Sequence, residues 1–192
     1  MKSITKEEIA TFDTEEFNGH IFVVDTPDKA EQAVNYLLGF SNLGFDTETR
    51  PSFKKGKLNS VALIQLATDN QCYLFRLNQI GFSPSLIRLL SNANIRKIGL
   101  SLKDDFTSMS RRMKFTPQGF VDLQKLISKH DIADTSLQKI YAILFQKKIS
   151  KSQQLSNWEA EKLSNAQQKY AALDAWACLK IYEKLCHINA FI

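Results

Sequence analysis

The chain has 192 residues, of which 44% are hydrophobic and 23% are charged, and this composition excludes a disordered or collagen-like chain. Its 25 lysines and arginines exceed its 20 aspartates and glutamates, so the formal net charge is +5, which permits a polyanionic partner without requiring one. The sequence has no apolar run of about 20 residues, no apolar segment at its start and no CxxC pair. We therefore expect a cytoplasmic protein without a membrane span, a secretory signal or a structural zinc site.

The predicted elements alternate between strands and helices. Residues 1–19 are expected to form a polar lead-in with a short helix, and residues 20–192 a single domain. Short apolar runs bounded by turn residues predict strands at His20–Asp25, Leu43–Glu48, Val61–Thr68, Cys72–Leu77 and Ile95–Gly99. Helical spacing predicts helices at Pro27–Leu38, Pro84–Leu90, Leu102–Met113 and Asn165–His187, and the pattern is helical from Val121 onward. This order predicts an α/β fold, with a mixed sheet and helices on both faces.

The first candidate site is a pair of acids at the end of the second predicted strand. Side chains alternate along a strand, so Asp46 and Glu48 share one face, while Leu43 and Phe45 point to the other. Two neighbouring carboxylates in a poorly hydrated site repel each other, and a hard divalent cation such as Mg²⁺ relieves that repulsion. The alternative is that the strand ends here and that both acids are solvated.

The second candidate acid lies in the helix expected after the fifth strand. At about 100° per residue, Leu102, Phe106 and Met109 form an apolar stripe. Asp105 lies at the edge of this stripe, whereas Asp104 lies nearly opposite and should face water. We therefore expect Asp105 to point inward. The alternative is that either acid caps the start of the helix.

The third candidate site lies on the last helix. Asp174 shares a face with Ala177, Ile181 and Leu185, which should be the buried face of the helix. A carboxylate on an apolar stripe is unfavourable unless it is paired or bound to a metal. Tyr170 lies one turn earlier, where its hydroxyl can reach the same site. The alternative is a core tyrosine with a nearby surface aspartate.

Four acids stand out in these motifs: Asp46, Glu48, Asp105 and Asp174. Oxygen ligands alone favour Mg²⁺ or Mn²⁺ over Zn²⁺. Two such ions, about 3.5–4 Å apart, are the usual arrangement for in-line attack on a phosphodiester. Tyr170, with an ordinary pKa near 10, is expected to orient an attacking water rather than to act as a base.

The three motifs together resemble those of the DEDD superfamily of 3′–5′ exonucleases, in the subclass with a tyrosine in the third motif. FDTE is similar to the first motif, IGLSLKDDF to the second, with Asp105 in the catalytic position, and YAALD to the third. Lys169 stands where the sister subclass has histidine. The stretches GFDTETRP, GKLNSVALIQLAT, KIGLSLKDD and LSNWEAEKLSNAQQKYAALDA are similar to Werner-type and ribonuclease-D-like exonuclease domains, so the resemblance extends over residues 20–187.

The resemblance implies a ribonuclease-H-like fold, with a mixed sheet of roughly five strands flanked by helices. It also implies two-metal hydrolysis of single nucleotides from a 3′ end, with release of nucleoside 5′-monophosphates. Asp46, Glu48 and Asp174 would hold the metal for the attacking water. Asp46 would bridge to a second metal that Asp105 helps to hold through water. Tyr170 matches the tyrosine that positions the attacking water.

The expected substrate is a single-stranded or 3′-recessed nucleic acid, and no protein partner can be inferred. Residues that resemble the family's substrate contacts are Thr47, Thr49, Arg50, Lys151 and Trp158. Trp158 would either stack on a base or belong to the core, and Phe53 presents the same choice. Lys54, Lys55 and Lys57 could contact phosphates. Werner-type relatives favour DNA; the alternatives are an RNA-directed enzyme, a non-catalytic nucleic-acid-binding module and a small-molecule phosphoesterase.

Overall fold

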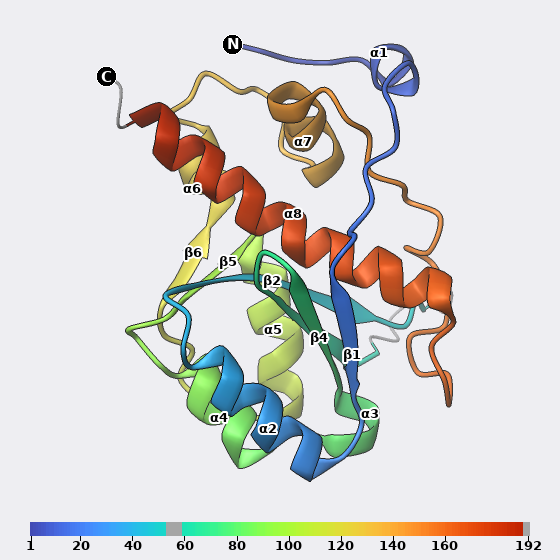
Figure 1. The fold of residues 1–192 in the computed structure, drawn as a ribbon, viewed down its shortest axis with the longest axis vertical. Coiled ribbons are helices and arrows are strands. Elements are labelled where there is room, and N and C mark those ends of the chain that lie inside the picture. Colours follow the sequence, from blue (N-terminus) through green and yellow to red (C-terminus); the bar gives the residue numbers. More distant parts are fainter. Residues whose placement is uncertain (53–58, 190–192) are drawn as a thin grey trace.

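The computed structural model of the chain describes residues 1–52 and 59–189. One mixed sheet lies at its centre, with the strand order β1-β4-β3-β2-β5-β6 (Figure 1). The strands are β1 (His20–Val24), β2 (Asn42–Thr49), β3 (Val61–Ala67), β4 (Gln71–Arg76), β5 (Arg96–Gly99) and β6 (Phe120–Asp122). β3 is antiparallel to both of its neighbours, whereas β1 with β4, β2 with β5, and β5 with β6 form parallel pairs.

All five predicted strands are present, and the sheet has a sixth strand that the sequence did not indicate. The sixth strand, β6, has three residues and lies where the sequence pattern predicted helix from Val121 onward. Three residues are too few for the alternation of a strand to be read from sequence. β6 forms because Ile98 and Val121 pair across the edge of the sheet, and its last residue, Asp122, then caps the following helix by accepting a hydrogen bond from Gln124 N at 3.0 Å.

Helices cover both faces of the sheet. They are α1 (Lys6–Ala10), α2 (Pro27–Leu37), α3 (Leu77–Ile80), α4 (Pro84–Leu90), α5 (Leu102–Arg112), α6 (Leu123–Ile127), α7 (Leu137–Phe145) and α8 (Asn165–Asn189). One apolar layer lies between the sheet and α6, α7 and α8, and a second lies between the sheet and α2, α4 and α5. Figure 1 shows α8 crossing the sheet diagonally. Among the described residues, no helix combines the length and apolarity needed to span a membrane.

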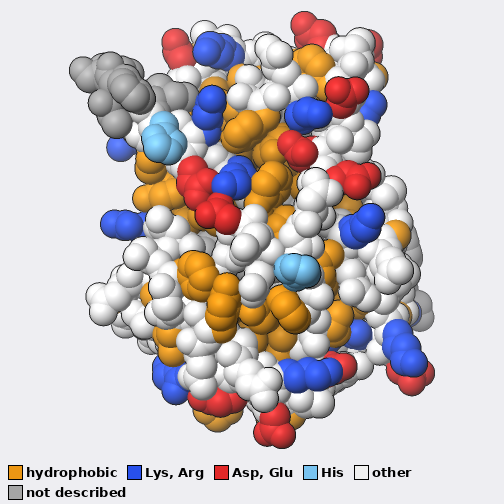
Figure 2. Space-filling model, in the orientation of Figure 1, with side chains coloured by type: hydrophobic (Ala, Val, Ile, Leu, Met, Phe, Trp, Pro, Cys, Tyr) orange, Lys and Arg blue, Asp and Glu red, His pale blue; other side chains and the backbone are white. Residues whose placement is uncertain are grey.

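The first 19 residues lie against the α7 side of the molecule. Tyr141 of α7 donates its hydroxyl hydrogen to Glu15 at 2.9 Å, and Ile4 N donates to Asp134 at 3.0 Å. Phe17 is buried in the apolar layer beneath α8. On the face that Figure 2 presents, acidic and basic side chains are interspersed around exposed hydrophobic ones, so the net positive charge does not form one basic patch on that face.

Gly44 allows β2 and α8 to approach closely. A Cβ at this position would lie 2.0 Å from the carbonyl oxygen of Ala175. We predict that Gly44→Ala lowers the free energy of unfolding by about 1–3 kcal/mol, because the strand and the helix must separate. Urea denaturation measures this change. Gly39→Ala is the matched control, since a Cβ there would meet only Tyr36 O at 3.3 Å; an equal loss in both variants would contradict the packing argument.

Candidate active site

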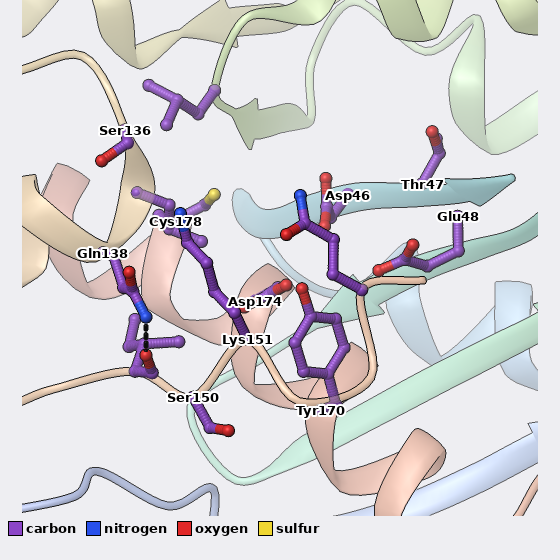
Figure 3. Close-up of a pocket in the computed structure, with 14 residues that line it drawn as sticks. Asp46, Thr47, Glu48, Ser136, Gln138, Ser150, Lys151, Tyr170, Asp174 and Cys178 are labelled. Carbon is purple, nitrogen blue, oxygen red and sulfur yellow. Dashed lines mark hydrogen bonds between the residues drawn. The ribbon is translucent and has the colours of Figure 1, made fainter. Parts of the chain in front are cut away.

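Three carboxylates converge where β2 passes beneath α8. Asp46 and Glu48 come from β2 and Asp174 from α8, and each offers one oxygen that lies within 4.8 Å of those of the other two. Figure 3 shows the three side chains pointing toward one another, while Thr47 points away from them. Asp46 and Glu48 share a face because they are two residues apart on a strand. Asp174 reaches them because Gly44 brings α8 against the same strand.

Asp105 reaches this region from the first turns of α5. It is half-buried and accepts a hydrogen bond from the hydroxyl of Thr47, whereas Asp104 beside it is exposed. The helix-face prediction that Asp105 points inward and Asp104 points to water is therefore confirmed. Asp105 is not one of the three converging acids, but its charge contributes to the raised pKa of Asp46 and of Glu48.

Burial raises the pKa of all four acids, and repulsion from the neighbouring site carboxylates adds to the rise at Asp46 and Glu48. Burial, together with Asp174 and Asp105, raises the pKa of Glu48 to about 9. The pKa of Asp174 rises to about 7 and that of Asp105 to about 6, in both cases mainly through burial. The pKa of Asp46 also lies well above its ordinary value, because it is desolvated beside three other carboxyls. The charged forms are therefore disfavoured in the protein alone.

The donor set fits a hard divalent cation. Among the described residues, none of the four acids forms an ion pair with a lysine or arginine within 4.0 Å. The converging ligand atoms are all carboxylate oxygens, which Mg²⁺ and Mn²⁺ prefer. A bound cation would place positive charge in direct contact with the carboxylates, which no described lysine or arginine does.

Tyr170 lies one helical turn before Asp174 and directs its hydroxyl at that carboxyl (Figure 3). The two side chains are hydrogen-bonded, and the bond lowers the pKa of Asp174 against the effect of burial. Burial, together with the charges of Asp174 and Glu48, raises the pKa of Tyr170 above its ordinary value. The tyrosine is therefore protonated at neutral pH and acts as a hydrogen-bond donor.

A cavity of about 290 Å³ opens beside the converging acids. Its lining includes Asp46, Glu48, Tyr170 and Asp174, together with residues of α7 and of the loop that precedes α8. Lys151 lines the cavity from this loop, and its charge helps to lower the pKa of Asp174. Among the described residues, the cavity therefore combines a floor lined by carboxyl groups with one exposed lysine at its rim.

Only some of the predicted substrate contacts lie at the cavity. Thr47 and Lys151 line the cavity, whereas, among the residues described, Thr49 and Arg50 do not. Arg50 is exposed and forms an ion pair with Glu159 at 3.3 Å. The predictions for Phe53, Lys54, Lys55 and Lys57 lie outside the described residues.

The proposed stacking of Trp158 on a base was wrong. Trp158 is fully buried, and its ring lies 6.0 Å from that of Tyr170, so no face of the indole is open to a ligand. The core alternative for this residue holds, because the loop before α8 folds the indole inward rather than toward the cavity.

Two buried polar residues near the site were missed by the sequence analysis. Gln65 is paired with Asp46 across β2 and β3 and is fully buried, and its amide has no hydrogen-bond partner among the described residues. Arg76, at the end of β4, is 1% exposed. For Gln65 the available signal was a single polar residue inside an otherwise apolar strand, where burial is unfavourable without a structural reason. Arg76 ends its strand, so its burial left no such signal.

The raised pKa values predict that the metal-free protein becomes less stable as the pH rises. A carboxyl with a higher pKa in the folded than in the unfolded state binds more protons when folded, so stability falls between the two pKa values. The fall should begin above about pH 4 and continue through the pKa of Asp174 at about 7 and that of Glu48 at about 9. Thermal unfolding in the presence of a chelator measures this change.

Saturating Mn²⁺ should raise the melting temperature more at about pH 8 than at about pH 5, because ligand carboxylates must lose their protons to bind a metal. Glu48→Gln should flatten the pH dependence of the metal-free protein. A metal-free melting temperature that rises across this range in the wild type and in Glu48→Gln alike would contradict the electrostatic description of the site.

The fold and the site together define the class of the chain, a ribonuclease-H-like α/β domain with a carboxylate cluster suited to divalent cations. A family model described as 3′-5′ exonuclease matches residues 21–188. The chain belongs to this 3′–5′ exonuclease family, as its motifs indicated.

Three similar proteins illustrate the relationship. The mouse bifunctional 3′-5′ exonuclease/ATP-dependent helicase WRN is 35% identical over 77% of this chain, which spans 11% of that protein. The Nibbler EXO domain of Aedes aegypti aligns with a TM-score of 0.79 and 25% identity, covering 91% of this chain and 94% of that one. Ribonuclease D of Trypanosoma brucei in complex with RNA U12 aligns with a TM-score of 0.76 and 22% identity, covering 88% and 63%, and shows the shared fold.

Proposed function

We propose that the chain removes single nucleotides from the 3′ end of a nucleic acid strand and releases nucleoside 5′-monophosphates. The observation that carries this proposal is the convergence of Asp46, Glu48 and Asp174 at one cavity. Three converging acids, two of them buried and none ion-paired among the described residues, are unfavourable unless they serve a bound metal. Membership of the 3′–5′ exonuclease family supports the direction of the reaction.

Two divalent cations, Mg²⁺ or Mn²⁺, are proposed as cofactors. Asp46, Glu48 and Asp174 would hold one of them, and Asp46 and Asp105 the other. When bound, such ions lower the pKa of a coordinated water and stabilise the negative charge that develops at the phosphorus and at the leaving 3′ oxygen. The hydroxyl of Thr47 would fix the orientation of Asp105, because it donates a hydrogen bond to that carboxyl.

Tyr170 would position the attacking water. Its hydroxyl is protonated and is held by Asp174, so it can direct the oxygen of the water toward the phosphorus but does not remove a proton at neutral pH. Lys151 would contact a phosphate of the strand, since it lines the cavity and is exposed at its rim.

A single-stranded or 3′-recessed DNA is proposed as the substrate, with RNA as the alternative. The similarity of the motifs to those of Werner-type exonuclease domains supports DNA. The Trypanosoma brucei ribonuclease D, which was solved with RNA, supports the alternative. A matched pair of DNA and RNA strands of one sequence separates these two possibilities.

The deciding experiment uses strands labelled at the 5′ end and incubated with Mg²⁺, Mn²⁺ or a chelator. A 3′–5′ exonuclease produces a ladder of shortened labelled strands together with free 5′-mononucleotides, and both disappear in the chelator. A blocked 3′ end should prevent the ladder. Salt-sensitive binding without turnover would indicate a non-catalytic module instead. Equal activity on mononucleotide esters, regardless of chain length, would indicate a small-molecule phosphoesterase.

A further inference from the structure

The loop before α8 contains a short segment, residues 156–161, that is fixed to the body of the protein at both ends. At its beginning, Gln167 of α8 donates its side-chain amide to Ser156 Oγ at 3.0 Å and to Asn157 O at 3.2 Å. Gln167 is itself buried, and it lies three residues before Tyr170 on the same helix. This contact fixes the beginning of the 156–161 segment to the helical turn that precedes the tyrosine.

The end of the 156–161 segment is fixed by Arg76. One terminal nitrogen of its guanidinium donates to Ala160 O, and the other donates to Glu161 O at 3.5 Å. Gln79, from α3, adds a hydrogen bond to Glu161 O at 3.1 Å. Because Arg76 is 1% exposed, its charge is satisfied largely by these carbonyls rather than by water.

Trp158 lies between these two attachments and packs against Tyr170. The two ring centroids are 6.0 Å apart and the rings are tilted by 37°, a normal geometry for an aromatic pair. Trp158 is fully buried, so its ring has little freedom to move away. Trp158 of the 156–161 segment therefore packs against the ring of Tyr170, whose hydroxyl is hydrogen-bonded to Asp174.

The arrangement is not optimised for stability alone. Arg76 Nε and Trp158 Nε1 are both buried and have no hydrogen-bond partner among the residues that the structure describes. An apolar side chain of similar size at either position would avoid an unpaired polar atom. Polar groups kept in such positions are typical of sites where geometry is required for function.

We propose that Arg76 is a positioning residue for hydrolysis: by fixing the 156–161 segment it holds Trp158 against Tyr170 and so sets the position of the tyrosine hydroxyl. Arg76 does not touch the substrate and acts only through the tyrosine. This inference rests on the proposed function, since it concerns the rate of the same reaction.

A double-mutant cycle tests this role. We expect Arg76→Met to lower kcat about tenfold or more with little change in KM, because small displacements of a positioned group reduce the rate steeply. In the Tyr170→Phe background, where no hydroxyl remains to be positioned, Arg76→Met should cause almost no further loss. Arg76→Lys keeps one cationic donor and should recover part of the rate; it also serves as the test variant if Arg76→Met does not fold.

Lys97→Met is the matched control. Lys97 is also a fully buried cation that donates to backbone carbonyls, Asn92 O at 2.6 Å and Ile95 O at 2.8 Å, but it has no contact with the 156–161 segment among the described residues. Any loss that it causes should be the same with and without the tyrosine hydroxyl.

Equal losses from the Arg76 variants in both backgrounds, or no loss in either, would overturn the positioning role and leave the proposed function intact. Failure of the proposed function itself would give a different experimental result. In that case the wild type would release no 3′ nucleotides, or Asp46→Asn would be as active as the wild type.

Discussion

Asp46→Asn is expected to lower the rate of 3′-terminal hydrolysis by about a thousandfold or more. Asp46 interacts with all three other acids, since the charges of Glu48, Asp174 and Asp105 each raise its pKa. A catalytic cation contributes several kcal/mol to stabilising the transition state, and each 1.36 kcal/mol corresponds to a factor of ten in rate. Single-turnover measurements on a labelled strand with saturating Mn²⁺ quantify the loss.

The same variant should not be unfolded. Replacing one carboxyl of a repelling cluster with a neutral amide of similar shape removes a source of strain, so the metal-free variant should melt at or above the temperature of the wild type. Asp104→Asn is the matched control, because Asp104 is an exposed acid directly beside Asp105. It should leave both the rate and the melting temperature almost unchanged. A wild-type rate in Asp46→Asn would show that the reaction takes place elsewhere.

Tyr170→Phe is expected to lower kcat about a hundredfold, at the lower end of the range for groups that assist proton transfer or orient a nucleophile. The substitution removes the hydroxyl and keeps the ring that packs on Trp158, so the fold should be unaffected. The affinity for Mn²⁺ should change little, because Tyr170 is not one of the converging ligands. Steady-state kinetics, with kcat and KM determined separately, measure the effect.

Tyr36→Phe is a control for this substitution. Tyr36 lies on α2 and is 40% exposed, on the opposite face of the sheet from α8. It should retain the full rate. A Tyr170→Phe variant with an unchanged kcat and a raised KM would mean that the tyrosine binds the strand and does not position the water.

The sequence was informative wherever local periodicity decides the structure. Strand alternation placed Asp46 and Glu48 on one face, and helix periodicity separated Asp105 from Asp104, as the structure confirms. The pairing of Tyr170 with Asp174 followed from their spacing of one helical turn. These features require only the geometry of single elements, and their meeting in one site was implied by the family resemblance.

The sequence was less informative wherever contacts between distant segments decide. β6 has too few residues for its period to be read, and it exists because β5 offers a free edge. Trp158 could have faced either the core or the cavity, and the choice depends on how Arg76 and Gln167 hold the loop. Arg76 belongs to β4 and Gln167 to α8, whereas the tryptophan lies in the loop between α7 and α8. The direction of the indole therefore could not be inferred from its neighbours in sequence.

The metal site is tested most directly by a titration with Mn²⁺ followed by electron paramagnetic resonance, on the wild type, Asp46→Asn and Asp104→Asn. We expect the wild type and Asp104→Asn to bind the ion tightly, and Asp46→Asn to lose most of this affinity while it remains folded. Binding of equal strength in all three proteins would contradict the claim that the acids of β2 and α8 form the metal site.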